Sequence, residues 1–234
     1  MRLAALPLLA ALLLGLAACG DDGDGDAAPT TGTSTTDTTP GFVEPDPLPR
    51  TEYEGGYLYE VADEGFEVAV PKLWVARSAS QVPDPQHLRR LSVEHTEIIG
   101  YFESLVGDSP ARFVAASPQL RQNFAPNLTI TVEEVEPGTT LGDYANRTLG
   151  QIQSTAANVR GEIRKTNVRI PAGPASLIRY ERSFSDTIVV HTRHYLLVQD
   201  DQGYALTFST ATPSADFDRA VERAVESFSF LENG

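Results

Sequence analysis

The chain has 234 residues, of which 41% are hydrophobic, and a formal net charge of −14 at pH 7. This length and composition fit one globular domain with appendages and exclude a wholly disordered or membrane-embedded chain. The negative charge argues against nucleic acid, because phosphate binding requires clustered Lys and Arg, and it disfavours direct docking on anionic lipid. Cys19 is the single cysteine, so no internal disulfide can form and the domain has to rely on its packed core.

Residues 1–18 have the three parts of a secretory signal peptide. Arg2 gives a positive start, an apolar run extends from Leu3 to Leu14, and small residues follow. A membrane helix needs roughly 20 predominantly apolar residues, and Pro7 interrupts this shorter run. We therefore expect the segment to be removed, which predicts an extracytoplasmic protein.

The end of this segment, Leu16-Ala17-Ala18-Cys19, resembles the lipobox of bacterial lipoproteins. The resemblance implies that a peptidase cuts before Cys19 and that diacylglycerol is attached to its thiol, giving two or three fatty acyl chains such as palmitate. Two chains hold a protein firmly at a membrane, whereas one gives only marginal binding. The alternative is an ordinary secreted protein in which Cys19 has no role.

Residues 19–50 form the predicted linker, which is rich in Asp, Gly, Thr and Pro and has almost no large apolar side chain. Such a segment cannot bury enough surface to offset the entropy of ordering, so we expect it to be disordered. Seven acidic residues and no basic one lie between Asp21 and Leu48. They predict a self-repelling tether, with a recognition tail for a basic partner as the alternative.

The folded domain is expected at residues 51–234, and its first elements are two strands. Residues 57–61 and 66–70 alternate apolar with smaller or polar side chains, which is typical of strands. Pro71 should end the second strand. Leu73 and Trp74 follow as expected core anchors.

A long helix is predicted next, over residues 84–107. Asp84 before Pro85 is a good N-cap and first-turn pair, and the apolar residues that follow share one helical face. Residues 111–116 and 128–135 read as the next two strands.

A second helix is predicted to begin at Thr140, which with Asp143 approximates a capping box, and to continue through Ile152. Ser214 caps a final predicted helix that runs to Phe228. Between the two helices lies a strand meander with short connections, which predicts antiparallel neighbours. Its strands are residues 162–170, 175–183, 188–199 and 204–210.

This pattern resembles the PsbP-like fold, a family that includes PsbP and the LpqN-type lipoproteins of actinobacteria. The residues that carry the resemblance are a Gly-Phe strand that ends in Pro and then Trp, the last meander strand, and the end of the last helix: Gly65, Phe66, Pro71, Trp74, 204–209, Ser227 and Phe228. The resemblance implies an α+β domain in which helices flank an antiparallel β-sheet, as in an αβα sandwich. It also implies accessory or binding roles that are mostly non-catalytic, and it transfers no active-site residue. The scarcity of lysine beside abundant Arg, Ala and Gly hints at a GC-rich genome, as in actinobacteria.

The four histidines do not form a local metal chelate. His87 and His95 would lie about 12 Å apart along a helix, and His191 and His194 would point to opposite faces of a strand. We therefore predict no metal site and no cofactor.

No nucleophile motif has the context that catalysis requires. Gly107-Asp108-Ser109 resembles a block of one esterase family, but the only Asp-x-x-His of the chain, from Asp84 to His87, lies upstream instead of near the end. Neither a Gly-x-Ser-x-Gly elbow nor a dinucleotide-binding glycine pattern is present. We predict that this block is a helix stop followed by a turn.

Other polar residues are interpreted structurally. Glu133 and Glu134 alternate across a strand and cannot face each other as an acid–base pair. Three tyrosines could line a ligand groove, although core packing explains them better: Tyr180, Tyr195 and Tyr204. Several arginines are interspersed with acids, which indicates surface pairing in preference to an anion site: Arg89, Arg90, Arg160, Arg164, Arg179, Arg182 and Arg193.

The sequence thus predicts a non-enzymatic lipoprotein, held by lipid on Cys19 at the extracytoplasmic face of the cell membrane. Its domain should bind or assist another cell-envelope component, a protein or a glycolipid. One alternative is a carrier that holds an amphipathic molecule in a cavity between sheet and helices. A hydrolase with a site assembled from distant residues is the remaining alternative.

Overall fold

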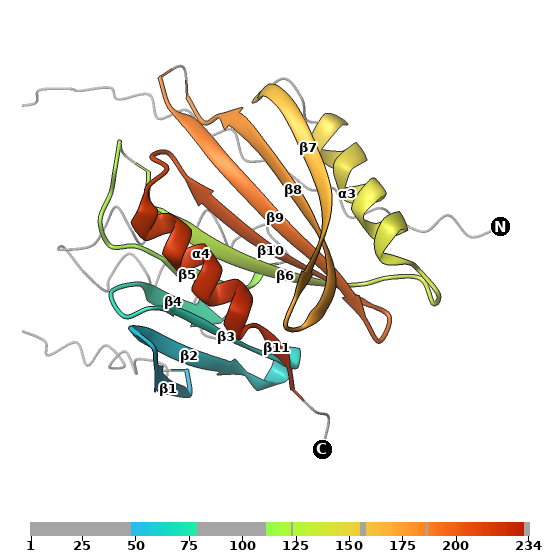
Figure 1. The fold of residues 1–234 in the computed structure, drawn as a ribbon, viewed down its shortest axis with the longest axis horizontal. Helices are drawn as coiled ribbons and strands as arrows, with labels where there is room; N and C mark the ends of the chain where they lie inside the picture. The colour runs from blue at the N-terminus through green and yellow to red at the C-terminus, as the bar shows by residue number, and fades with distance from the viewer. Residues whose placement is uncertain (1–47, 79–110, 123, 155–157, 186, 232–234) are drawn as a thin grey trace, which may run out of the picture. The chain divides into compact units, whose positions relative to one another are not determined.

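The computed structural model describes residues 48–78, 111–122, 124–154, 158–185 and 187–231 (Figure 1). Within them lie strands in two antiparallel sheets and two α-helices, which confirms the predicted α+β class. The predicted helix over residues 84–107 lies outside the described residues. The elements are β1 (Arg50–Tyr53), β2 (Gly56–Val61), the short 3₁₀ helix η1 (Ala62–Glu64), β3 (Phe66–Pro71), β4 (Val75–Ser78), β5 (Ala111–Ala116), β6 (Asn127–Glu134), α3 (Leu141–Ser154), β7 (Val159–Ile170), β8 (Gly173–Ser183), β9 (Val189–Gln199), β10 (Gln202–Thr210), α4 (Ala215–Ser227) and β11 (Ser229–Phe230).

The larger sheet has the strand order β4-β5-β6-β10-β9-β8-β7, and every neighbouring pair is antiparallel. Strands β7 to β10 form the predicted meander. Its last hairpin turns at Asp200 and Asp201, whose φ angles of 50° and 58° match a type I′ turn. Short connections therefore fix the order of these four strands.

The smaller sheet has the order β1-β2-β3-β11 and was predicted only in part. Strands β2 and β3 match the predicted segments, whereas β1 and β11 of this sheet and β4 of the larger sheet were not predicted. The final strand pairs Ser229 with Glu67 and Phe230 with Phe66, so residues more than 160 positions apart complete this sheet. Leu48 packs partly buried against the core, ahead of β1.

Each helix begins at a cap that the sequence indicates. Thr140 and Asp143 form the expected capping box, in which the Asp143 amide donates to Thr140 Oγ1 at 3.2 Å and the Thr140 amide donates to Asp143 Oδ2 at 3.3 Å. The Ser214 side chain accepts from the Phe217 amide at 3.2 Å at the start of α4. No helix among the described residues combines the length and the apolar character needed to cross a membrane.

The two faces of the larger sheet bury different partners, because side chains alternate along each strand. One face packs against α3, with Ile178, Leu196 and Ala205 beneath the helix. The opposite face packs against α4 and the smaller sheet, as the helix in front of the sheets in Figure 1 shows. The expected sandwich is thus present, but on the α4 side a second sheet shares the layer with the helix.

Aromatic side chains fill the layer between α4, the smaller sheet and the larger sheet. Phe66 is fully buried and contacts Phe113, Tyr204 and Phe228 with ring centroids 5.6 to 6.5 Å apart. Burying such a side chain contributes about 1.5–3 kcal/mol. This packing makes β3 and the end of α4 one unit with β5 and β10.

One predicted core anchor is wrong. Leu73 is 73% exposed, because it lies in the turn after Pro71 and not on a strand face. Trp74 is partly buried against the main core, as predicted for an anchor, although it is not enclosed.

Candidate functional site

Several residues singled out in the sequence lie outside the described residues. They include Cys19, His87, His95 and the block Gly107-Asp108-Ser109. The lipid attachment, the leader and the esterase-like block therefore remain predictions. Among the residues that the structure describes, no group of three or more His, Cys, Asp or Glu side chains could hold a metal ion.

His191 and His194 point to opposite faces of β9, as the strand periodicity predicted. His191 Nδ1 lies 3.2 Å from Glu181 Oε1 on the side of the larger sheet that carries α4. His194 lies on the side that carries α3. The two rings therefore cannot act on one ligand.

His194 is held between two hydroxyl groups next to the apolar cluster under α3. Its Nε2 is 3.1 Å from the Tyr180 hydroxyl and its Nδ1 is 2.8 Å from Thr207 Oγ1. The Tyr180 ring stacks on the imidazole, with 5.5 Å between centroids and 15° between planes. Because each hydroxyl can donate or accept, a neutral imidazole is satisfied in either tautomer.

Burial lowers the pKa of His194 to about 4, with a smaller contribution from the positive charge of Arg182. Burial also raises the pKa of the Tyr180 hydroxyl. The Nε of Arg182 is itself buried without a hydrogen-bond partner. His194 is therefore neutral in the folded protein near pH 7, and its surroundings oppose a second positive charge.

This polar cluster lacks the parts of a catalytic triad. Its hydrogen bonds join an imidazole to two hydroxyl groups, and no carboxylate takes part in these contacts to orient the ring as a base. Among the described residues, these hydrogen bonds orient Tyr180, His194 and Thr207 on the α3 side of the larger sheet and supply no acid–base pair.

Basic residues concentrate on strands β7, β8 and β9. These strands hold seven of the 18 Lys and Arg residues of the chain but only two of its 32 Asp and Glu residues. The surplus of positive charge is local, since the chain as a whole carries −14. We call this region the basic strip; its members are Arg160, Arg164, Lys165, Arg169, Arg179, Arg182 and Arg193.

The strand register aligns three of these arginines across the sheet. Arg164 is opposite Arg179, and Arg179 is opposite Arg193, so the three side chains lie on the same face. This is the face that carries α4, because residues of the same parity on these strands, Val168, Ala175 and Tyr195, belong to the main core. We call Arg164, Arg179 and Arg193 the arginine row.

The two ends of the arginine row have carboxylate partners. Arg164 Nε lies 3.0 Å from Glu162 Oε2, and both side chains are largely exposed. Arg193 donates to Asp218 Oδ1 of α4 at 2.6 Å. Arg179, in the middle, is exposed and has no ion pair among the described residues. The expected surface pairing thus holds for the two end arginines.

Sequence reasoning missed the row itself. The arginines occur 15 and 14 positions apart, and only the register of two hairpins brings them together. The available signal was the excess of basic residues between positions 160 and 193, against an acidic background.

The three tyrosines do not line a common groove. Tyr204 packs among Phe66, Phe228 and Phe230, and Tyr195 packs edge-on against Phe208. Tyr180 lies on the opposite face, against His194. All three rings thus make packing contacts, and Tyr180 does not share a face with the other two.

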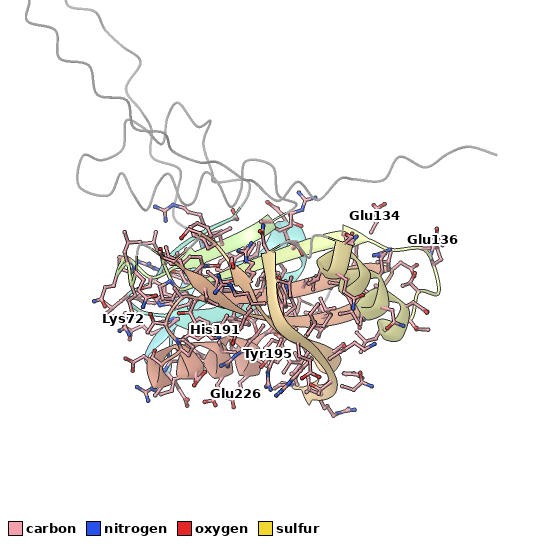
Figure 2. All side chains as sticks on the ribbon, turned by 90° about the horizontal axis from the view of Figure 1, so that it is seen from above. Lys72, Glu134, Glu136, His191, Tyr195 and Glu226 are labelled. Carbon is pink, nitrogen blue, oxygen red and sulfur yellow. The ribbon has the colours of Figure 1, made fainter. Side chains whose placement is uncertain are left out.

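Glu133 acts as an ion-pair partner within the fold. Its Oε1 accepts from Arg147 of α3 at 3.1 Å, while the exposed Glu134 is the next residue along the strand (Figure 2). As neighbours along β6, the two acids point to opposite faces of the sheet.

Comparison of the sequence with protein-family models and with curated proteins finds no match. Among solved structures, the chain is similar to the cyanobacterial PsbP, CyanoP, from Synechocystis. The match has 13% identity and a TM-score of 0.48, and it covers 74% of this chain and 91% of CyanoP. The chain is also similar to LpqN, described as involved in cell envelope biogenesis of Mycobacterium tuberculosis. That match has 10% identity and a TM-score of 0.42, and it covers 80% of this chain and 87% of LpqN.

Proposed function

We propose that this protein is a membrane-anchored extracytoplasmic lipoprotein whose PsbP-like domain is a non-enzymatic binding module for another cell-envelope component. The anchoring part is supported by Leu16-Ala17-Ala18-Cys19 at the end of an apolar leader. Lipid on Cys19 would hold the chain at the membrane, and residues 19–50 would give the domain reach.

The binding part depends on one observation, the arginine row, in which three arginines share one face of the larger sheet on a chain of net charge −14. A local surplus of one charge on a surface of the opposite sign selects a complementary partner and raises its rate of association. The packed aromatic layer between α4 and the larger sheet provides no comparable support for a carrier of amphipathic molecules.

The anchor is tested by exchanging Cys19 for Ser in the full chain, expressed in a bacterium that processes lipoproteins. The expected result is loss of incorporated alkyne-palmitate and release of the protein from the membrane fraction. Thr35→Ser, a change of similar size in the linker, is the matched control and should leave both signals intact. Unchanged membrane retention of the Cys19→Ser protein would contradict the anchor.

The non-enzymatic role is tested with the purified full chain and a simple activated ester, p-nitrophenyl acetate. We expect no hydrolysis beyond the rate of an equal amount of unfolded chain. Turnover that disappears in Ser109→Ala would instead support the hydrolase.

A further inference from the structure

The arginine row places like charges opposite one another on three neighbouring strands. Adjacent strands lie about 4.8 Å apart, and like charges directly opposite across strands are destabilising. Glu162 and Asp218 relieve the two ends, whereas Arg179 remains exposed between them. Glu181 lies on the same face of β8, two residues from Arg179, but its Oε1 is next to His191 Nδ1 at 3.2 Å. Among the described residues, Arg179 at the centre of the row therefore has no carboxylate partner.

We propose that the arginine row is the docking site for an acidic segment of a partner protein, whose carboxylates pair with Arg164, Arg179 and Arg193. The guanidinium group binds carboxylates through paired hydrogen bonds, which makes arginine well suited to this role. The proposal rests on the binding role proposed above and is independent of the lipid anchor.

The dimensions of the row fit a short acidic segment. Three strands at this spacing extend over about 10 Å, which two turns of helix bearing acids at i, i+3 and i+7 can match. Tyr195 lies two residues from Arg193 on the same face and is partly exposed, beside α4 in Figure 2. Its ring offers an apolar contact at one end of the segment.

The surroundings of the row favour a narrow protein segment over an anionic membrane. Helix α4 lies on the same face and exposes Asp216, Glu222 and Glu226 to solvent. A flat anionic bilayer that reached the row would also approach these carboxylates, which it would repel. A segment about one helix wide can contact the row without covering α4.

A competing explanation is protection of a sheet edge. Among the described residues β7 pairs only with β8, and charged side chains on an edge strand discourage association with other strands. This explanation accounts for Arg164 but not for Arg179 and Arg193, which belong to interior strands. The two explanations also predict different responses to charge reversal.

The experiment measures binding of a fluorescently labelled decaglutamate peptide to the purified full chain, at about 20 mM salt where screening is weak. Arg179→Glu should lower the affinity by about fivefold or more, and higher salt should weaken binding of the unaltered chain. Glu162→Gln should raise the affinity by about two- to fivefold, because it frees Arg164 from its internal partner. This gain cannot arise from misfolding.

Arg169→Glu is the matched control, because Arg169 lies on the same edge strand but on the opposite face of the sheet. It should change the affinity by less than about twofold. Equal losses for Arg169→Glu and Arg179→Glu would overturn the proposal, as would no binding of decaglutamate.

Binding to phosphatidylglycerol vesicles alone would assign the row to a membrane. Self-association of Arg164→Glu with unchanged peptide binding would assign it to edge protection. None of these results depends on Cys19, so failure here and failure of the anchor are distinguishable.

Discussion

Replacing His194 by Gln tests whether the buried imidazole makes the domain sensitive to acid. The pKa of His194 is about 4 in the folded protein, against an ordinary value of 6.5. Below pH 6.5 the unfolded chain therefore takes up a proton that the folded chain refuses. As the pH decreases from 6.5 to about 4, this group lowers the free energy of unfolding by about 1.4 kcal/mol per pH unit. Above pH 6.5 and below about pH 4, its contribution no longer changes with pH.

The total loss from this one residue is about 3 kcal/mol, a large share of the roughly 5–15 kcal/mol that stabilises a typical domain. Other groups also titrate between pH 4 and pH 7. The effect of His194 is therefore measured as the difference in free energy of unfolding between the unaltered chain and the His194→Gln variant. The free energy of unfolding of the unaltered chain minus that of His194→Gln should fall by about 3 kcal/mol between pH 7 and pH 4.

The assay is urea unfolding at a series of pH values, followed by the fluorescence of Trp74, the only tryptophan of the chain. Tyr180→Phe is the matched control: it removes the hydroxyl bonded to His194 but keeps the ring that covers it. It should cost about 1 kcal/mol and keep most of the pH dependence, because burial is the largest cause of the shift. A difference between the unaltered chain and His194→Gln that does not vary with pH would refute the reasoning.

Three further substitutions test the packing, each by urea unfolding. Gly203→Ala should destabilise the protein by about 1–3 kcal/mol, because the new Cβ would lie 2.8 Å from the ring of Tyr144. An unchanged urea midpoint of unfolding would mean that α3 can shift to make room. Gly150→Ala, in α3 with open space around it, should instead stabilise by about 0.5–1 kcal/mol, and a loss there would contradict the assigned helix. Ser227→Ala should lower the free energy of unfolding by about 1–3 kcal/mol, since the buried amide of Ala69 donates to Ser227 Oγ at 2.7 Å. An unchanged free energy of unfolding would show that another acceptor replaces the Ser227 hydroxyl.

The elements with strong local signals could be predicted from the sequence. The capping box of Thr140 and Asp143, the Ser214 cap and the alternation of β6 each depend on a few neighbouring residues. The short turn at Asp200 and Asp201 likewise fixed two strands as antiparallel neighbours. Periodicity alone placed His191 and His194 on opposite faces.

The features that sequence reasoning missed depend on contacts between distant residues. Strand β11 has only two residues and forms by pairing with the edge of β3, so no local sequence pattern predicts it. Leu73 was misassigned because hydrophobicity predicts burial only when the backbone points the side chain inward. The arginine row needs the register of two hairpins, which composition cannot supply.

The pairing of β3 with β11 bears on how the chain reaches its folded state. The amide of Leu231 donates to the Gly65 carbonyl at 2.9 Å, and Ser229 Oγ donates to Glu67 at 2.8 Å. Because the chain is synthesised from its amino end, β3 is made early, whereas β11 follows more than 160 residues later. Until β11 pairs with it, one edge of β3 can form hydrogen bonds with other strands or other chains. Pairing between strands so far apart in the sequence is slow. Deleting Ser229–Leu231 should therefore lower the yield of folded protein more than the small number of residues suggests.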